Sequence, residues 1–391
     1  MKLTDLYQMV RQLPAPTDLR HFGNDALQGE LLEYMLRQLG VQPTQVDEIS
    51  DALELERGRV FAVRWDLTVG EAGFKLPVMA SLLLYHLWRR KSSPEDIRML
   101  CDGGNINTAL ALGHLAKRLG LHAEHVLSRH FPEFIRSYLR DRGGNDLTLI
   151  EAPATRLGKE REFYSHLVKV MRDPSRRGTS LCLWHAKYGG IATRWLGDAL
   201  CKSWDIAPDD IVLGLGSGST LESFAFPLKQ RFGDKPRIMV AEHEKSPLLK
   251  VPVIANLTDR LLQPSRFSSE FVSPPASIPH SILGPHYDEI NPFLSDTELA
   301  CIDGVVRYGD GVWQDTSHLC RLANMPVGNS SAANLAVARH LAAQGRTVFT
   351  FIYEPLREFY LEQQQTTNSP QASLHFQPKI ERECRDYSMT F

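Results

Sequence analysis

The sequence contains no long apolar stretch and no excess of either charge. Its longest apolar run, Leu76 to Tyr85, covers ten residues and includes a proline, whereas a membrane-spanning helix needs about 20 residues. Lys and Arg together number 44 and Asp and Glu together 46, which leaves a net charge of −2. A protein that binds nucleic acid over a dominant surface would need a basic excess. We therefore expect neither a membrane span nor a nucleic-acid partner.

Recognisable metal-binding motifs are also missing. None of the six cysteines belongs to a C-x-x-C pair, and the 14 histidines include no H-E-x-x-H motif.

The first residues carry Asp5 and Arg11 where a secretory signal would be apolar. We therefore expect reduced thiols in a cytoplasmic protein with no metal site.

The composition is that of an ordinary globular protein. The chain has 391 residues, 43% of them hydrophobic and 23% charged, which suits two domains with a buried core. Short apolar runs alternate with helical patterns, as is typical of β-α-β units and a parallel sheet. The expected helices cover residues 27–39, 75–90, 108–119, 131–140, 191–204, 221–232, 316–322 and 332–343. The expected strands cover residues 60–65, 98–101, 122–127, 147–151, 210–216, 237–242, 304–308 and 347–353.

Two segments interrupt this alternation. Residues 251–292 hold seven prolines among many serines, which favours a long irregular excursion. The tail from residue 363 is polar, and we expect it to be loose.

The strongest local signal is the turn Gly214-Leu-Gly-Ser-Gly-Ser-Thr220, which lies between an expected strand and an expected helix. Alternate glycines allow a tight turn whose N–H groups converge on a phosphate, and three hydroxyls add donors. A Walker loop is excluded because no Gly-Lys-Ser/Thr follows. A dinucleotide motif would need glycine at Ser219, although Glu242 could still bind a ribose hydroxyl. A nicotinamide-dependent enzyme therefore stays open as an alternative.

Two weaker signals precede this turn. Lys75 follows Gly73-Phe74 at the start of an apolar helix, where burial would lower the pKa of its amine and suit it to form a Schiff base. Alone, such a lysine is more often a surface residue. The segment Asp102-Gly-Gly-Asn105 is a second strand-to-helix turn, in which Asn105 would cap the helix.

Taken together, these segments resemble the fold-type II pyridoxal-phosphate enzymes, the superfamily of the tryptophan synthase β-subunit and cysteine synthase. The resemblance spans roughly residues 60–360. Gly73-Phe-Lys75 is similar to the family's Ser-(Phe/Val)-Lys, and Gly104-Asn105 with Thr108-Ala-Leu-Ala111 is similar to its Ser-Gly-Asn-Thr-Gly-x-Ala-Leu-Ala. Gly216–Thr220 resembles its Gly-Thr-Gly-Gly-Thr phosphate loop. Val327–Ala332 resembles its late Gly-x-Ser-Ser-Gly-Ala helix.

The resemblance implies an α/β fold of two domains, with parallel-rich twisted sheets and helices on both faces. An N-terminal helical segment, residues 1–58, would pack on the larger domain. A smaller domain, residues 59–175, would carry Lys75 and the Asn105 loop. A larger domain, residues 176–362, would carry the phosphate loop, and residues 363–391 would form the tail. The resemblance also implies a homodimer.

The family's site residues carry over position by position. Lys75 would be the catalytic residue and hold pyridoxal 5'-phosphate as a Schiff base. Asn105 would contact the cofactor's ring oxygen. The phosphate would bind Gly216, Ser217, Gly218, Ser219 and Thr220.

This sequence departs from the family where the substrate binds. The family usually offers Ser or Thr on both sides of Gly-Asn, whereas Asp102 and Gly103 precede Gly104 here. These three residues are the expected substrate contacts, and an Asp would repel a substrate carboxylate unless its side chain turns away. Tyr188, just before a Gly-Gly pair, is a further candidate substrate contact.

A second departure lies after the last strand. Pro355 stands where the family often places a Ser or Thr against the pyridine nitrogen. The neighbouring Glu354 is expected to pair with a protonated nitrogen instead, which would strengthen the cofactor as an electron sink.

The implied function is replacement at the β-carbon of a small amino-acid substrate, as in cysteine synthase, through an aminoacrylate. A β-elimination lyase or ammonia-lyase of the same fold is one alternative. A catalytically inactive, cofactor-binding regulatory homologue is another, which Asp102, Gly103 and Pro355 would favour. An NAD-dependent dehydrogenase is the third.

Overall fold

The computed structural model describes residues 2–13, 26–41, 45–67, 71–128, 131, 133–152, 160–176, 178–233, 235–257, 290–291 and 293–357. The chain divides into one compact unit, Met1–Leu356, and a second unit, Arg357–Phe391. All elements named below lie in the first unit. Within the described part of the chain, no helix combines the length and the apolar character needed to cross a membrane.

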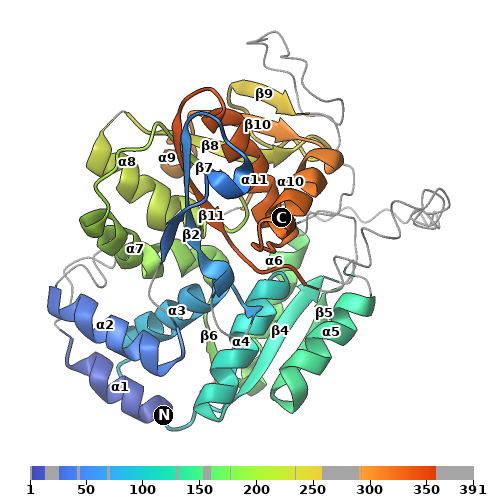
Figure 1. The fold of residues 1–391 in the computed structure, drawn as a ribbon. Coiled ribbons are helices and arrows are strands. Elements are labelled where there is room, and N and C mark those ends of the chain that lie inside the picture. The colour runs from blue at the N-terminus through green and yellow to red at the C-terminus, as the bar shows by residue number, and fades with distance from the viewer. Residues whose placement is uncertain are drawn as a thin grey trace. The chain divides into compact units, whose positions relative to one another are not determined.

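Seven strands form the larger sheet, in the order β1-β2-β11-β7-β8-β10-β9 (Figure 1). Neighbouring strands run parallel except for β1 and β2, which are antiparallel. The predicted parallel-rich sheet is confirmed, and it places the carboxyl ends of these strands at one edge. The strands are β1 (Val46–Glu48), β2 (Arg59–Arg64), β7 (Asp210–Gly214), β8 (Arg237–His243), β9 (Val253–Leu257), β10 (Gly304–Tyr308) and β11 (Thr347–Ile352).

Four parallel strands form a smaller sheet in the order β5-β4-β3-β6. Helices α4 (Ile106–Leu119) and α5 (Glu133–Gly143) pack against it (Figure 1). Its strands are β3 (Met99–Gly103), β4 (His122–Ser128), β5 (Leu147–Ala152) and β6 (Ser180–Cys182). The remaining helices are α1 (Leu3–Arg11), α2 (Ala26–Gln38), α3 (Lys75–Arg89), α6 (Glu160–Met171), α7 (His185–Ser203), α8 (Phe226–Phe232), α9 (Asp296–Leu299), α10 (Asp310–Leu322) and α11 (Asn329–Ala342).

Helix α4 shows how local sequence fixes an element that carries the site. Asn105 is its N-cap, and the side-chain oxygen of Asn105 accepts the Thr108 N–H at 3.3 Å. Gly120 ends the helix in the left-handed conformation, with φ of 65°. The Ala- and Leu-rich face between these caps is buried. The cap therefore fixes Asn105 at the N-terminal end of α4.

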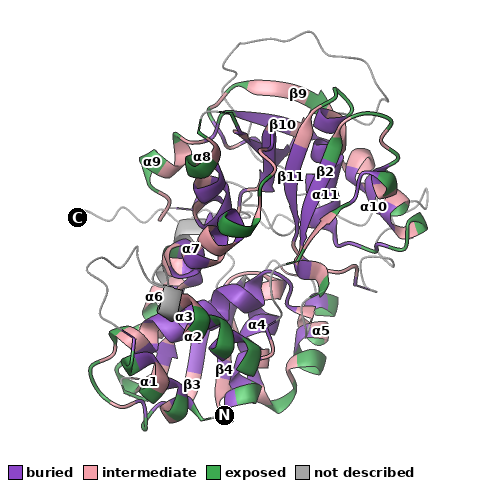
Figure 2. Ribbon diagram, turned by 60° about the vertical axis from the view of Figure 1, so that its left-hand side comes forward, coloured by how far each residue is buried: buried purple, intermediate pink, exposed green. Residues whose placement is uncertain are grey.

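An aromatic group connects the larger sheet to the start of α3. The ring of Trp65, just after β2, stacks on Phe74 at 4.1 Å and on Phe351 of β11 at 5.4 Å. Figure 2 shows β2, β11 and α11 in the colour of buried residues through much of their length. Burial of such large aromatic surfaces stabilises the region from which Lys75 projects.

The structure differs from the expected elements in several places. Helix α6, strand β6 and helix α9 were not predicted, and α10 begins at Asp310 rather than at residue 316. Strand β1 was not predicted, because Val46-Asp-Glu48 is short and polar. Helix α7 begins at His185 rather than at residue 191, because two glycines in its first turns weaken the helical pattern. The phosphate-loop helix starts with a π-helical segment, Leu221–Ala225, before α8.

Other expectations fall partly outside the described residues. The expected irregular segment contains strand β9, so that expectation is wrong for Val253–Leu257, and residues 258–289 lie outside the description. The tail from residue 363 also lies outside it. The domain boundaries stay a prediction, although β2 belongs to the seven-stranded sheet and β6 to the four-stranded one.

Candidate active site

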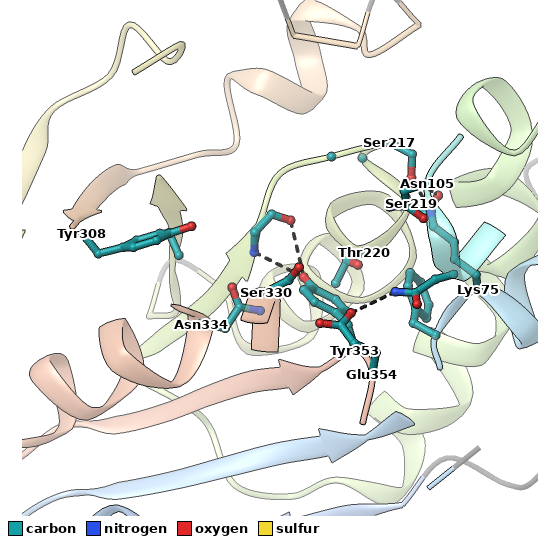
Figure 3. Close-up of a pocket in the computed structure, with 16 residues that line it drawn as sticks. Lys75, Asn105, Ser217, Ser219, Thr220, Tyr308, Ser330, Asn334, Tyr353 and Glu354 are labelled. Carbon is teal, nitrogen blue, oxygen red and sulfur yellow. Dashed lines mark hydrogen bonds between the residues drawn. The ribbon is translucent and has the colours of Figure 1, made fainter. Parts of the chain in front are cut away.

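A cleft lies where the larger sheet's strand ends meet the starts of α3, α4 and α11 (Figure 3). Its walls include residues from the ends of β7, β8, β10 and β11. Eight of the residues predicted from sequence line it: Lys75, Asn105, Gly216, Ser217, Gly218, Ser219, Thr220 and Glu354. The fold brings these eight residues together around one cleft. Their roles in binding remain predictions.

Lys75 is the first residue of α3 and is buried, with 8% of its surface exposed. Its Nζ donates to the Ser217 Oγ at 2.9 Å. Burial lowers the pKa of this amine to about 8, while the negative charge of Asp102 acts in the opposite direction. The preceding residue is fixed as well, because the Phe74 N–H donates to the Tyr353 carbonyl at 2.9 Å. A held amine with a lowered pKa is suited to nucleophilic attack on a carbonyl.

The loop after β7 has the features of a phosphate-binding turn. Gly218 adopts φ of 80°, a conformation that favours glycine. The Oγ atoms of Ser217 and Ser219 lie 2.9 Å apart, and Thr220 is 94% buried at the start of the following helix. Hydroxyls and backbone N–H groups at a helix N-terminus are suited to bind an anion.

Glu354 lies beyond the end of β11 and is 2% exposed. The Nδ2 of Asn107 donates to its Oε2 at 2.9 Å, across 247 residues of sequence. Sequence reasoning missed Asn107, because its partner follows a distant strand. A buried carboxylate held in this way can pair with a protonated ring nitrogen.

Four further cleft residues were also missed. Tyr353 lies at the end of β11, and its hydroxyl accepts the Gly214 N–H at 3.3 Å. Burial raises the pKa of this phenol, although contacts from Asn334, Thr220 and Gly214 oppose the rise. Tyr308, Ser330 and Asn334 also line the cleft. A polar residue at the end of an apolar strand was the available signal for Tyr308 and Tyr353.

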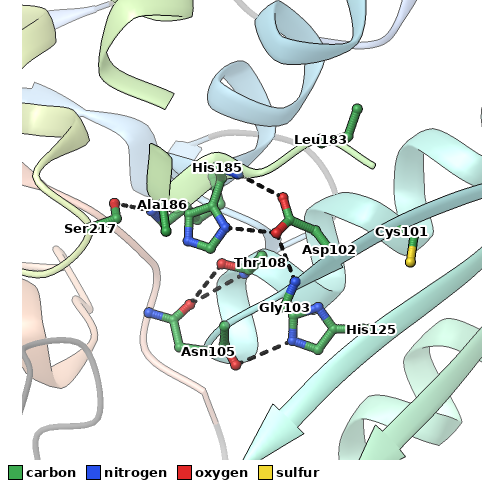
Figure 4. Close-up of polar contacts among 12 residues, drawn as sticks. Cys101, Asp102, Gly103, Asn105, Thr108, His125, Leu183, His185, Ala186 and Ser217 are labelled. Carbon is green, nitrogen blue, oxygen red and sulfur yellow. Dashed lines mark hydrogen bonds and ion pairs between the residues drawn. The ribbon is translucent and has the colours of Figure 1, made fainter. Parts of the chain in front are cut away.

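The four expected substrate residues do not themselves line this cleft, although Gly104 is the neighbour of Asn105, which does. Asp102, Gly103, Gly104 and Tyr188 are absent from the described cleft lining. The Asp102 carboxylate turns to His185, whose Nδ1 lies 3.2 Å from its Oδ1 (Figure 4). Tyr188 packs against the rings of Tyr85 at 6.1 Å and His86 at 5.8 Å. Their roles in substrate binding remain predictions.

The charge of Asp102 is compensated by its neighbours. Burial alone would raise the pKa of this carboxyl, but the charge and hydrogen bonds of His185 and the Gly103 N–H hold it below its usual value. Asp102 is thus an ionised group facing His185. The repulsion that an Asp at this position would exert on a bound carboxylate is correspondingly reduced.

Comparison with protein families identifies one match, described as pyridoxal-phosphate dependent enzyme, over residues 37–351. The chain therefore belongs to the family of pyridoxal-phosphate-dependent enzymes. Its cofactor is pyridoxal 5'-phosphate. The family match confirms the resemblance seen in the sequence and removes the support for a nicotinamide-dependent enzyme. Comparison with curated protein sequences gives no match.

Solved structures share the fold. An O-ureido-L-serine synthase variant bound to O-ureido-L-serine has 16% sequence identity and a TM-score of 0.61, over 85% of this chain and 94% of the other. An O-acetylserine-dependent cystathionine β-synthase from Helicobacter pylori has 18% identity and a TM-score of 0.61, over 84% and 96%. A hydrogen sulfide-producing enzyme in complex with an α-aminoacrylate intermediate has 16% identity and a TM-score of 0.59, over 85% and 91%. The two-domain fold-type II architecture of these enzymes is the fold of this chain.

The residues in the cleft fit the family's cofactor. An amine with a lowered pKa, a hydroxyl-rich loop at a helix N-terminus and a buried carboxylate lie around one space. These groups match an aldehyde, a phosphate and a ring nitrogen, respectively.

Proposed function

We propose that this enzyme replaces a substituent at the β-carbon of an amino acid, with Lys75 as its catalytic residue. The observation that carries the proposal is the buried Lys75 amine, which has a pKa near 8 and lies 2.9 Å from the Ser217 hydroxyl. The cleft that contains it also holds Asn105 and Glu354.

The roles of the residues follow from their chemistry. The loop from Gly216 to Thr220 would hold the cofactor's phosphate, Asn105 its ring oxygen and Glu354 its ring nitrogen. When bound, pyridoxal phosphate stabilises negative charge that develops at the α-carbon of an amino acid. The Lys75 Nζ, once free, would remove the proton from that carbon. Glu354 would keep the ring nitrogen protonated, and Asn107 would keep Glu354 in place.

Replacement is favoured over elimination by the names of the structural relatives. One is an O-ureido-L-serine synthase and another is an O-acetylserine-dependent cystathionine β-synthase. We infer that the substrate is a serine derivative in which the β-oxygen carries an acyl, phosphoryl or similar group and leaves the β-carbon together with that group. The hydrogen sulfide-producing relative keeps β-elimination as the second candidate.

The test is to incubate the holoenzyme with O-acetyl-L-serine or O-phospho-L-serine, with and without sulfide. Replacement would consume sulfide and yield cysteine plus acetate or phosphate. Elimination would consume water and yield pyruvate and ammonia with the same leaving group. Lys75→Ala is the matched control and should abolish either product. If a broad set of β-substituted amino acids gives neither product nor spectral change, the proposed reaction is wrong and a regulatory homologue is favoured.

We also propose that the enzyme is a cytoplasmic homodimer. The support is the resemblance to its family and a set of free thiols at Cys101, Cys182, Cys201, Cys301 and Cys320. Sedimentation of the purified protein tests the dimer, and fractionation of the source cells tests the location.

A further inference from the structure

The first turn of α7 contacts the loops on both sides of the cleft (Figure 4). On one side it is bound by Asp102, the residue before the last one of β3, next to the turn that holds Asn105. On the other it is bound by Asn291, which also contacts the phosphate loop. Both contacts are made by buried side chains and fall on adjacent residues, His185 and Ala186.

The Asp102 carboxylate accepts three hydrogen bonds, two from His185 in α7 and one from Gly103. Its Oδ2 accepts the backbone N–H of His185 at 3.0 Å, and its Oδ1 accepts the Gly103 N–H at 2.7 Å. The His185 Nδ1 is the third donor, at 3.2 Å from Oδ1. Asp102 is fully buried and His185 is 5% exposed. Charge-assisted hydrogen bonds are strong where water is excluded, so this buried carboxylate holds His185 and Gly103 in fixed positions.

The His185 ring also limits the position of the Asn105 loop. Gly104 has φ of 151°, and a β-carbon at this position would lie 2.9 Å from the ring's Cε1. From another side, the His125 Nε2 lies 3.2 Å from the Gly104 carbonyl oxygen. Burial lowers the pKa of His125 to about 4, so it is a neutral donor to that oxygen. Gly104 is thus confined between two imidazoles.

The second contact is made by the side-chain amide of Asn291, which uses both of its N–H donors and its oxygen. The Asn291 Nδ2 donates to the Ala186 carbonyl and to the Ser217 carbonyl, each at 2.8 Å. The Asn291 Oδ1 accepts the Phe293 N–H at 3.1 Å. The side-chain oxygen of Ser217 also accepts the hydrogen bond that the Lys75 Nζ donates. Asn291 therefore connects the phosphate loop directly to the start of α7.

We propose that Asp102, His185 and Asn291 are positioning residues that connect the two loops in series, so that phosphate binding at Gly216–Thr220 orders the Gly103–Asn105 loop. Occupation of one loop would then favour binding at the other by population shift. The proposal rests on the phosphate role assigned to the loop after β7. It does not depend on whether the reaction is replacement or elimination.

Hydrogen exchange on the full-length, cofactor-free protein tests this with inorganic phosphate as the probe. In the wild type, saturating phosphate should slow exchange in peptides covering residues 216–222 and also in peptides covering 103–108. In Asn291→Ala and in Asp102→Asn, protection at 216–222 should persist at saturation. Protection at 103–108 should fall about fivefold or more, the lower end of common coupling factors.

The double variant and a matched control separate a series connection from general loosening. Because the two contacts act in series, Asn291→Ala combined with Asp102→Asn should lose no more coupling than either alone. Thr193→Val is the control, because Thr193 connects a later turn of α7 to Ser223 of the phosphate-loop helix. It should retain protection at 103–108. If Asn291→Ala does not fold, Asn291→Ser keeps one donor and should lose part of the coupling.

Three results would overturn the proposal. One is a wild type in which phosphate protects 216–222 but leaves 103–108 unchanged. Another is full protection of 103–108 in both single variants. The third is a wild type without protection at 216–222, which would also remove the phosphate assignment but leave the product assays of the proposed reaction standing.

Discussion

The Nζ atom of Lys75 lies 2.9 Å from the Oγ atom of Ser217, a residue 142 positions further along the chain. The contact joins the start of α3 to the loop after β7. The hydroxyl of Ser217 lies in turn 2.9 Å from that of Ser219. The predicted cofactor anchor and the predicted phosphate loop are therefore neighbours in one cleft.

The lowered pKa of Lys75 predicts its reactivity in the cofactor-free protein. With a pKa of about 8, half of the amine is neutral at about pH 8, whereas an ordinary lysine with a pKa of about 10.4 is less than 1% neutral there. Reductive methylation followed by peptide mass spectrometry should give a midpoint near pH 8 for Lys75. Asp102→Asn should move the midpoint lower, because the Asp102 charge raises this pKa. A midpoint near pH 10 would contradict the assignment.

Two substitutions test the phosphate loop. Gly218 has φ of 80°, and a β-carbon there would also meet the Leu294 side chain at 2.2 Å. Gly218→Val should therefore distort the turn and remove most of the cofactor affinity. Thr220→Ala should cost less, about 1.5–3 kcal/mol for one hydrogen bond to a charged group. Cofactor titration by fluorescence measures both, and wild-type affinity in Gly218→Val would exclude this loop from the site.

Glu354→Gln should slow turnover about tenfold or more, which corresponds to about 1.4 kcal/mol or more of barrier. The reason is that a neutral amide stabilises a protonated ring nitrogen less well than a carboxylate does. Asn107→Leu removes the donor that holds Glu354 and should give a smaller loss in the same direction. Steady-state rates at saturating cofactor provide the measurement. Unchanged rates in Glu354→Gln would show that the Glu354 carboxylate does not pair with the ring nitrogen of the cofactor.

His125 should make the protein less stable in mild acid. Burial lowers its pKa in the folded state to about 4, whereas an exposed histidine has a pKa of about 6.5. Between these values the unfolded chain binds the extra proton, so stability falls as the pH falls from about 6.5 to 4. The loss from this residue is roughly 3 kcal/mol.

His125→Gln should flatten that part of the profile, because glutamine keeps an N–H donor for the Gly104 carbonyl but does not titrate. Urea unfolding of both proteins at several pH values is the measurement. The same slope in the variant and the wild type would mean that another group causes the loss.

Sequence reasoning located the elements and loops that a local pattern defines. The apolar runs at β7 and β11, the capped helix α4 and the glycine turn after β7 all agree with it. Lys75 and Asn105 could be predicted because each belongs to a short motif beside an element boundary. Parallel strands then bring such boundaries to a common edge.

Sequence reasoning failed where a contact joins two distant segments. Asp102 could be suspected of repelling a substrate, but nothing near it in sequence shows that its carboxylate faces His185, 83 residues away. Asn107 and Asn291 are ordinary polar residues until the fold places them against Glu354 and Ser217. Side-chain direction across a cleft depends on tertiary packing, which local propensity does not encode.

The backbone hydrogen bond from Phe74 to Tyr353 has a consequence for how this enzyme can evolve. It joins the residue before Lys75 to the residue before Glu354, and it uses no side-chain atoms. Substitution of either side chain can therefore remodel the wall of the cleft while the spacing of amine and carboxylate is retained. Changes at these two neighbours would alter the shape of the cleft without moving the Lys75 amine or the Glu354 carboxylate.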